Sequence, residues 1–116
     1  MRRLAVYHEE RLLLDGVRLA ERPWQRMRGL LFRPCPDERG GLLIQPCNSV
    51  HMFGMRYALD VLFLDREGRV LRAVTGLRPW RAAWAPRAHA ALELAPGSIE
   101  RLGIEGGMRL TWREVA

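Results

Sequence analysis

The fold is decided by residues 58–75, which read ALDVLFLDREGRVLRAVT. Residues 58–64 are dense in valine, leucine and phenylalanine, and such a run is typical of a strand that is buried on both faces. The following Asp65-Arg66-Glu67-Gly68 has the composition of a hairpin connection, with Gly68 placed for a left-handed backbone. Residues 69–75 form the partner strand, so the stretch predicts an antiparallel hairpin.

Further strand signals extend from this hairpin in both directions. Short runs rich in branched and aromatic residues alternate with turn residues, as in antiparallel sheets. We expect these strands at residues 4–8, 11–20, 42–45, 50–55, 89–95 and 108–114.

Two short helical segments interrupt the strands. Pro23 suits a first helical turn, and apolar residues recur from Trp24 to Leu31 at spacings of three and four, which predicts a helix over 23–32 with its arginines outside. A single helical turn follows Gly97, with Ser98 expected as its cap and Gly103 as its terminator.

These elements predict one α+β domain over residues 1–116. Several short antiparallel strands with one short helix and one helical turn favour a small, mainly antiparallel curled sheet or a partial β-barrel. Residues 76–88 are expected to form a loop, because Pro79 and Pro86 interrupt any strand pattern there.

The composition is that of a soluble globular protein. Hydrophobic residues make up 48% of the chain and charged residues 28%, which are ordinary proportions. No apolar run approaches the roughly 18 to 20 residues that a membrane helix needs, and the apolar run after Arg3 is too short for a secretory signal. We therefore expect a cytoplasmic protein without a membrane partner.

The charge of the chain is strongly biased towards arginine. All 19 basic residues are arginine, against 13 acidic residues, and the net charge is +6. A basic protein of this kind attracts polyanions such as nucleic acid. The arginines are spread along the chain, which equally fits a solvated surface shaped by a GC-rich coding bias.

The two cysteines, Cys35 and Cys47, are expected to be free thiols. The spacing Cys47-x-x-x-His51 lacks the second ligand pair of a structural zinc site, so we expect no metal and no cofactor. A Cys47–His51 pair could activate a thiolate, which leaves a Cys/His-dependent enzyme as one alternative. An extended backbone would separate the two side chains by about 13 Å, so direct contact needs a turn at Asn48-Ser49.

Polar side chains within apolar sequence mark a second candidate site. Such groups need partners or a use. Glu93 lies on the small-residue face of its strand, where Arg26 or Arg56 could pair with it in a structural ion pair. The alternative is a pocket for a small anionic or polar ligand, formed by the 47–60 segment and Glu93. Its candidate ligand-binding residues are Arg26, Asn48, His51, Arg56, Asp60 and Glu93.

The predicted loop at 78–87 supports a rival function. It interleaves arginine with tryptophan, as required for stacking on the bases of single-stranded nucleic acid. No recognised nucleic-acid motif accompanies it, and tryptophans between prolines also close the open end of a small sheet. The candidate residues are Arg78, Trp80, Arg81, Trp84 and Arg87.

Several short motifs, taken in order, match a known family. They are Arg26 with Gly29-Leu30-Leu31, His51, Met55-Arg56, the run 59–65, Gly68-Arg69-Val70, the run 92–97 and Gly107. Over nearly its whole length the chain resembles the uncharacterised bacterial and archaeal family called domain of unknown function 192. The resemblance implies a small, mainly β fold, favours the polar pocket, and supplies no accepted activity, substrate or cofactor. The chain departs from the family where Met108 replaces the usual aspartate after Gly107.

Overall fold

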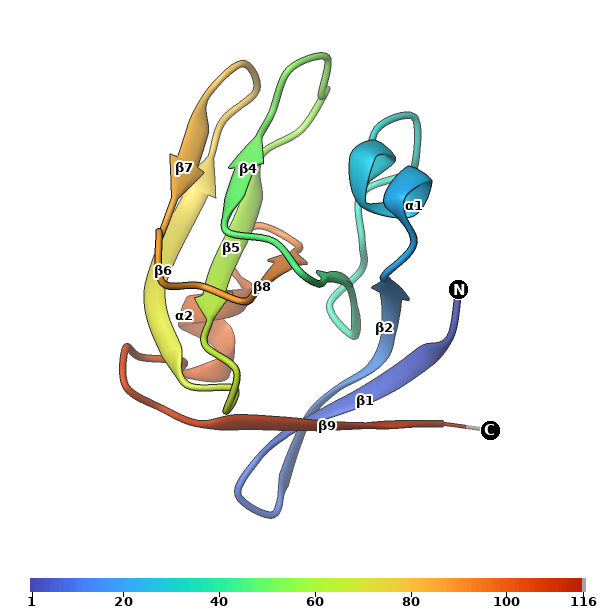
Figure 1. Cartoon of the computed structure of the whole chain (residues 1–116). Helices are drawn as coiled ribbons and strands as arrows, with labels where there is room; N and C mark the ends of the chain where they lie inside the picture. The colour runs from blue at the N-terminus through green and yellow to red at the C-terminus, as the bar shows by residue number, and fades with distance from the viewer. Residues whose placement is uncertain (116) are drawn as a thin grey trace.

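The computed structural model describes residues 1–115, which form nine strands and two short helices (Figure 1). The elements, in chain order, are β1 (Arg3–His8), β2 (Arg11–Ala20), α1 (Pro23–Arg28), β3 (Gly40–Ile44), β4 (Ser49–His51), β5 (Leu59–Leu64), β6 (Val70–Leu77), β7 (Ala82–Trp84), β8 (Ala90–Leu94), α2 (Ser98–Leu102) and β9 (Leu110–Glu114). The α+β class predicted from the sequence is confirmed. Neither helix is long and apolar enough to cross a membrane.

Seven strands form the main sheet, in the order β6-β5-β8-β3-β2-β1-β9. Only β2 and β3 pair in parallel; every other neighbouring pair is antiparallel. Every residue of β3, β5 and β8 is buried, because these strands lie in the interior of the sheet with both faces covered. The predicted hairpin of β5 and β6 is confirmed, and Gly68 has the expected left-handed backbone with φ 82°.

The sheet curls until its two edges meet at one end. The Val70 amide donates to the Met108 carbonyl and the Leu110 amide to the Gly68 carbonyl, both at 2.8 Å, on either side of a bridge between Arg69 and Arg109. Beyond this point β6 and β9 are not neighbours. The structure is therefore a curled sheet, as predicted, that is not closed into a barrel.

Each face of the sheet is covered by a separate apolar cluster. On one face, Leu43, Leu62 and Leu92 pack with Ile99 of α2. On the other face, Val61 and Phe63 pack with Val50 of a separate two-stranded ribbon of β4 and β7 and with Met52, which follows β4. Figure 1 shows this ribbon and α1 at the same end of the molecule. The second face therefore carries the elements that surround the candidate site.

The ribbon differs from the sequence prediction in two ways. The predicted loop at 76–88 contains a strand, β7, whose Ala83 pairs with Val50 of β4. The predicted strand at 50–55 is shorter, because β4 ends at His51 and a turn at Gly54 has φ 81°. The segments Ser49–His51 and Ala82–Trp84 thus pair as one ribbon that covers part of the sheet.

The helix predicted over 23–32 begins at Pro23 as expected, but it is shorter than predicted and lacks the expected buried apolar face. Helix α1 ends at Arg28, where Gly29 has φ 54°, and neither Trp24 nor Met27 is buried: they are 64% and 83% exposed. Six residues make fewer than two turns, and only Leu30, after the helix, reaches the core.

The predicted cap of the second helix is also wrong. Gly97, with φ 90°, is the N-cap of α2, and Ser98 is buried within the first turn. The Ser98 hydroxyl oxygen accepts a hydrogen bond from Arg101, at 3.4 Å, instead of capping the helix. The predicted terminator is confirmed, since Gly103 follows the helix in a left-handed conformation.

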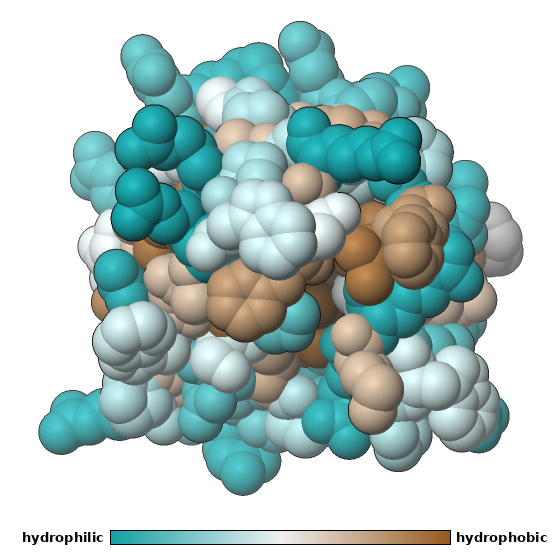
Figure 2. Space-filling view, turned by 90° about the horizontal axis from the view of Figure 1, so that it is seen from above, coloured by the Kyte–Doolittle hydropathy of each residue, from teal (hydrophilic) through white to brown (hydrophobic). Residues whose placement is uncertain are grey.

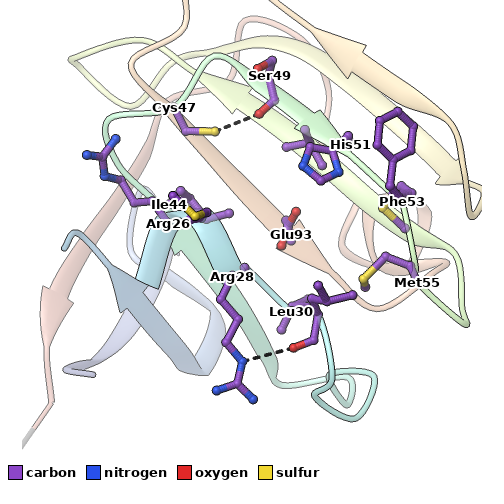
Figure 3. Close-up of a pocket in the computed structure, with 15 residues that line it drawn as sticks. Arg26, Arg28, Leu30, Ile44, Cys47, Ser49, His51, Phe53, Met55 and Glu93 are labelled. Atoms are coloured by element: carbon purple, nitrogen blue, oxygen red, sulfur yellow. Dashed lines mark hydrogen bonds between the residues drawn. The ribbon is translucent and has the colours of Figure 1, made fainter. Parts of the chain in front are cut away.

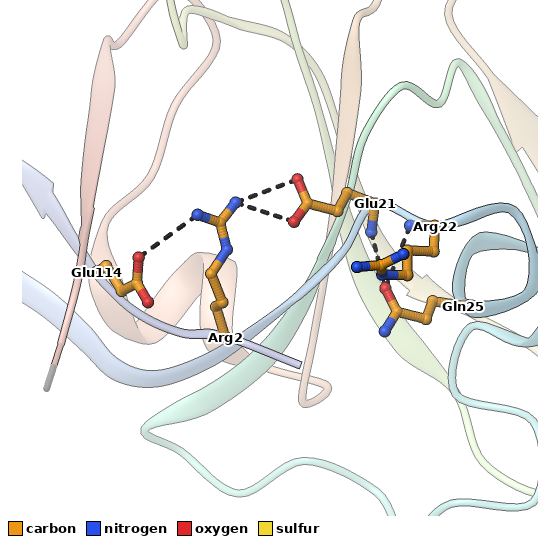
Figure 4. A network of polar contacts seen from close by, with 5 residues as sticks. All are labelled: Arg2, Glu21, Arg22, Gln25 and Glu114. Carbon is orange, nitrogen blue, oxygen red and sulfur yellow. Dashed lines mark hydrogen bonds and ion pairs between the residues drawn. The ribbon is translucent and has the colours of Figure 1, made fainter.

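A network of polar contacts fixes the start of α1 (Figure 4). The Gln25 side-chain oxygen accepts hydrogen bonds from the backbone amides of Glu21 and Arg22, which caps the first turn. Arg2 then joins Glu21 at the end of β2 to Glu114 at the end of β9. These contacts hold α1 at the edge of the candidate site.

Candidate ligand-binding cavity

A cavity of about 80 Å³ opens between the segment 26–31 on one side and residues 47–55 on the other (Figure 3). This volume holds two or three water molecules at roughly 30 Å³ each, so only a small chemical group can enter it fully. The lining residues are Arg26, Met27, Arg28, Gly29, Leu30, Leu31, Ile44, Cys47, Ser49, Val50, His51, Met52, Phe53, Met55 and Glu93.

Glu93 provides the only acidic side chain of this lining. It lies in β8 between Leu42 of β3 and Val61 of β5, and it is 5% exposed. Its Oε1 atom is buried and has no hydrogen-bond partner among residues 1–115. Burial away from water raises the pKa of the Glu93 carboxyl from 4.5 to about 7. The cavity therefore holds a carboxyl group that changes charge near neutral pH.

Gly29 keeps the space above this carboxyl open. A Cβ atom at Gly29 would lie 3.7 Å from Glu93 Oε1, in van der Waals contact with it. The left-handed backbone of Gly29, with φ 54°, also ends α1 at this point. The residue that ends the helix thus leaves room beside Glu93.

The structure does not contain the ion pair considered for Glu93. The Arg26 guanidinium donates through Nη1 to the Pro46 carbonyl, at 3.3 Å, and its buried Nε has no partner among the described residues. Both an N–H donor and a carboxyl acceptor therefore lack partners in the lining of one cavity. An occupant that accepts from Arg26 and donates to Glu93 would satisfy both.

The structure separates three predicted site residues from this cavity. Asp60 lies on the opposite face of the sheet, where its carboxylate accepts from the backbone amides of Gly76 and Ile99, both at 2.9 Å. Arg56 lines a neighbouring depression with Arg33 and Tyr57. Asn48 is exposed, and its carbonyl accepts from the Ala85 amide within the ribbon. The structure brings together Arg26, Cys47, His51 and Glu93.

Cys47 and His51 share the cavity but have different partners. The Cys47 thiol donates to the Ser49 carbonyl at 3.1 Å, and burial raises the pKa of this thiol. The His51 ring stacks on Phe53 with centroids 4.8 Å apart. A neutral thiol bonded to a carbonyl is the opposite of the activated thiolate that a Cys/His enzyme needs. No cluster of three or more His, Cys, Asp or Glu side chains within residues 1–115 is arranged to hold a metal ion.

A row of stacked aromatic side chains, His51, Phe53 and Trp80, extends from the cavity to the arginine- and tryptophan-rich segment 78–87. Phe53 stacks on Trp80 with centroids 6.1 Å apart, which extends the contact between His51 and Phe53. Trp80 and Trp84 are 68% and 60% exposed, and the predicted loop residues Arg78, Arg81 and Arg87 are exposed as well. Figure 2 shows apolar side chains gathered around a hollow at this end of the molecule, with hydrophilic side chains around them.

Sequence reasoning missed Gly29, Met27, Phe53 and Met55 as cavity residues. Apolar side chains and glycines do not identify a binding site in a sequence, because most apolar side chains form the core and most glycines form turns. Two signals were present, since Gly29 lies in the family motif and Glu93 is flanked by leucines. Neither signal shows that the two residues lie next to each other.

The sequence is similar to an uncharacterised protein family. A family model described as DUF192, an uncharacterised ACR, matches residues 8–112. A UPF0127 protein of Pyrococcus furiosus is 35% identical, with 85% of this chain and 88% of that protein covered. A UPF0127 protein of Pyrococcus horikoshii is 34% identical, with coverages of 94% and 98%.

Two solved structures share the architecture. One is from Sinorhizobium meliloti, is described as a candidate transcription regulator, and has a TM-score of 0.82 at 26% identity. The match covers 96% of this chain and 92% of the Sinorhizobium chain. The other, of unknown function, is from Novosphingobium aromaticivorans and has a TM-score of 0.82 at 23% identity, with coverages of 95% and 84%. The second likeness concerns the fold alone.

Proposed function

The chain belongs to the uncharacterised DUF192 family, and we propose that it binds a small polar ligand through Glu93. The observation that carries this proposal is the buried Oε1 atom of Glu93, which lines the cavity without a hydrogen-bond partner among residues 1–115. The ligand donates a hydrogen bond to this atom.

The unsatisfied carboxyl supports a binding role because it destabilises the folded protein. A buried polar group without a partner costs about 1–3 kcal/mol. A leucine or glutamine side chain at position 93 would avoid the charge at neutral pH. Strongly shifted pKa values together with an open cavity are typical of functional sites. A donor on the ligand restores the missing hydrogen bond and lowers the pKa of Glu93.

The lining also defines the chemistry of the ligand. Of the anionic and polar classes considered from the sequence, Glu93 favours the polar one, because an anion would meet a second negative charge in a buried space. Arg26 Nε offers a donor for an acceptor atom on the ligand. Leu30, Ile44 and Met52 surround the space with apolar groups that suit a short aliphatic body.

Three molecules of the same size and different head groups test this function. We would titrate ¹⁵N-labelled protein with n-butylammonium, butyramide and butyrate, and follow amide shifts at Gly29, Leu42 and Glu93. The ammonium and amide compounds are expected to shift these signals saturably, and butyrate much less, above pH 7. Glu93→Gln should remove the preference for ammonium over butyrate. Equal responses to all three compounds, or shifts elsewhere only, would refute the proposal.

Single-stranded nucleic-acid binding is a second candidate. It is supported by the aromatic row that ends at Trp80, by the exposed arginines of the loop, and by the description of the similar Sinorhizobium protein as a candidate transcription regulator. A titration with a short single-stranded oligonucleotide at low and raised salt tests it. Shifts centred on 78–87 that weaken steeply with salt support it, and Trp80→Ala should abolish them.

A further inference from the structure

Strand β4 has one free backbone edge. The Met52 amide donates to the Arg81 carbonyl at 2.8 Å, and the Ala85 amide donates to the Asn48 carbonyl at 2.9 Å. Residues 48, 50 and 52 therefore direct their backbone groups towards β7, and by alternation Ser49 and His51 direct theirs to the opposite edge. The ribbon has only two strands, so no other strand within residues 1–115 pairs with this edge, although the Ser49 carbonyl on it accepts from the Cys47 thiol with one of its two lone pairs.

This free edge lies beside the cavity. Ser49 and His51 line it from one side, and the segment from Arg26 to Leu31 lines it from the other. Figure 3 shows Glu93 between these two walls. The cavity thus has a strand edge on one wall and the segment from Arg26 to Leu31 on the other, and an uncovered strand edge is where an extended peptide adds a strand to a sheet.

The walls of this cavity suit a peptide in two respects. Met27 and Phe53 are exposed apolar side chains, Met55 is half-buried beside them, and unbranched methionine side chains adapt to varied partners. Unpaired backbone amides and carbonyls at a strand edge are a template for another chain. A small molecule without a peptide backbone would leave this strand edge without hydrogen-bond partners.

The unpartnered Glu93 carboxyl in the cavity favours a side chain that carries an N–H donor. In an extended peptide every second side chain points the same way, so one of them reaches the cavity floor. A lysine places its four-carbon stem along Leu30 and Ile44 and its ammonium group against the unpartnered carboxylate. Arg26 and Arg28 at the mouth, and the net charge of +6, favour acidic residues on either side of that lysine.

We infer that the ligand of this cavity is an extended peptide segment that adds a third strand to the free edge of β4 and inserts a lysine towards Glu93. This inference rests on the proposed function, because it names the ligand class of the same cavity. The backbone hydrogen bonds to Ser49 and His51 supply affinity, and Glu93 supplies specificity.

Three matched peptides test the inference. The first is acetyl-Glu-Val-Lys-Val-Glu-amide, the second carries norleucine in place of lysine, and the third has both valine nitrogens methylated. Each is titrated into ¹⁵N-labelled protein above pH 7. The lysine peptide should shift the amides of Ser49, His51 and Gly29. The norleucine and methylated peptides should each bind about tenfold or more weakly, because each loses a charged or a backbone hydrogen bond.

Glu93→Gln provides the control within the protein. This variant should keep the weaker binding of the norleucine peptide and lose the preference for lysine. Equal affinity for the lysine and norleucine peptides, or an unchanged affinity after methylation, would overturn the inference. Binding of n-butylammonium without any peptide shift at Ser49 and His51 would also overturn it while leaving the proposed function intact. If neither n-butylammonium nor the lysine peptide bound, the inference and the proposed function would both be rejected.

Discussion

Asp60 and Glu93 lie on neighbouring strands, one position apart in register, and point to opposite faces of the sheet. Asp60 of β5 is opposite Leu94, and Glu93 of β8 is opposite Val61. Both carboxyls are buried, at 1% and 5% exposure. Asp60 accepts two backbone hydrogen bonds, whereas Glu93 Oε1 has no partner among the described residues. One carboxyl stabilises the fold, and the other is left available to a ligand.

Asp60→Asn should destabilise the protein without changing ligand binding. The carboxylate joins Gly76 of β6 to Ile99 in the first turn of α2, and an amide can accept only one of these two bonds without turning an N–H towards a donor. We expect a loss of about 1–3 kcal/mol in the free energy of unfolding. Urea denaturation measures it. Asp15→Asn, in a surface ion pair with the exposed Arg39, is the control and should change stability much less.

Glu93→Gln should remove a pH dependence from stability. The folded pKa of about 7 lies above the ordinary value of 4.5, so the folded state holds the proton more tightly than the unfolded chain. The corresponding stability is complete below about pH 4.5 and is lost as the pH rises through 7, by roughly 3 kcal/mol in total. When both proteins are denatured across this range, the stability of Glu93→Gln should therefore increase relative to that of the wild type as the pH rises. A constant difference would contradict the assignment.

Gly68→Ala should cost far more stability than Gly97→Ala. Both glycines have positive φ, at 82° and 90°, so both variants carry the backbone strain of a left-handed alanine, about 1 kcal/mol. A Cβ atom at Gly68 would also collide with the Leu110 carbonyl oxygen, whereas the space around Gly97 is open. We expect a loss of roughly 2–5 kcal/mol for Gly68→Ala. Similar losses for the two variants would show that the contact between Gly68 and Leu110 of β9 is loose.

Cys47 should react slowly with iodoacetamide near neutral pH. Burial raises the pKa of its thiol, which lowers the thiolate fraction, and the thiol donates to the Ser49 carbonyl. Cys35→Ser isolates the Cys47 reaction, and the same variant in urea supplies the unhindered rate. If Cys47 reacted faster in the folded protein than in the unfolded one, the result would support the alternative of a Cys/His-dependent enzyme.

The parts of the fold that the sequence predicted are those with a regular pattern. The run 58–64 is apolar except for Asp60, and it proved to contain the buried strand Leu59–Leu64. Trp24 and Met27 have helical spacing, but both are exposed instead of packed in the core. Strand β7 is only Ala82–Trp84 between two prolines, which is too short for any alternation to show. Tertiary pairing with β4 made it a strand.

The candidate site was predictable in its components and not in its geometry. Glu93 stood out because leucines flank it, and Arg26 and His51 were named with it. Asp60, which was expected beside them, lies on the other face of the sheet, because the register of β5 and β8 places Val61 and not Asp60 opposite Glu93. The expected partner Arg26 bonds to Pro46 instead. Such outcomes depend on strand pairing between distant segments, which local sequence patterns do not specify.

The titration of the Glu93 carboxyl carbon, observed by ¹³C NMR with and without n-butylammonium, tests the central claim most directly. The account predicts a midpoint near pH 7 in the free protein, because the carboxyl is buried and unpaired. It also predicts a clear fall of that midpoint when the ammonium group binds, since a neighbouring positive charge favours the carboxylate. A midpoint near 4.5 that the amine leaves unchanged would contradict it.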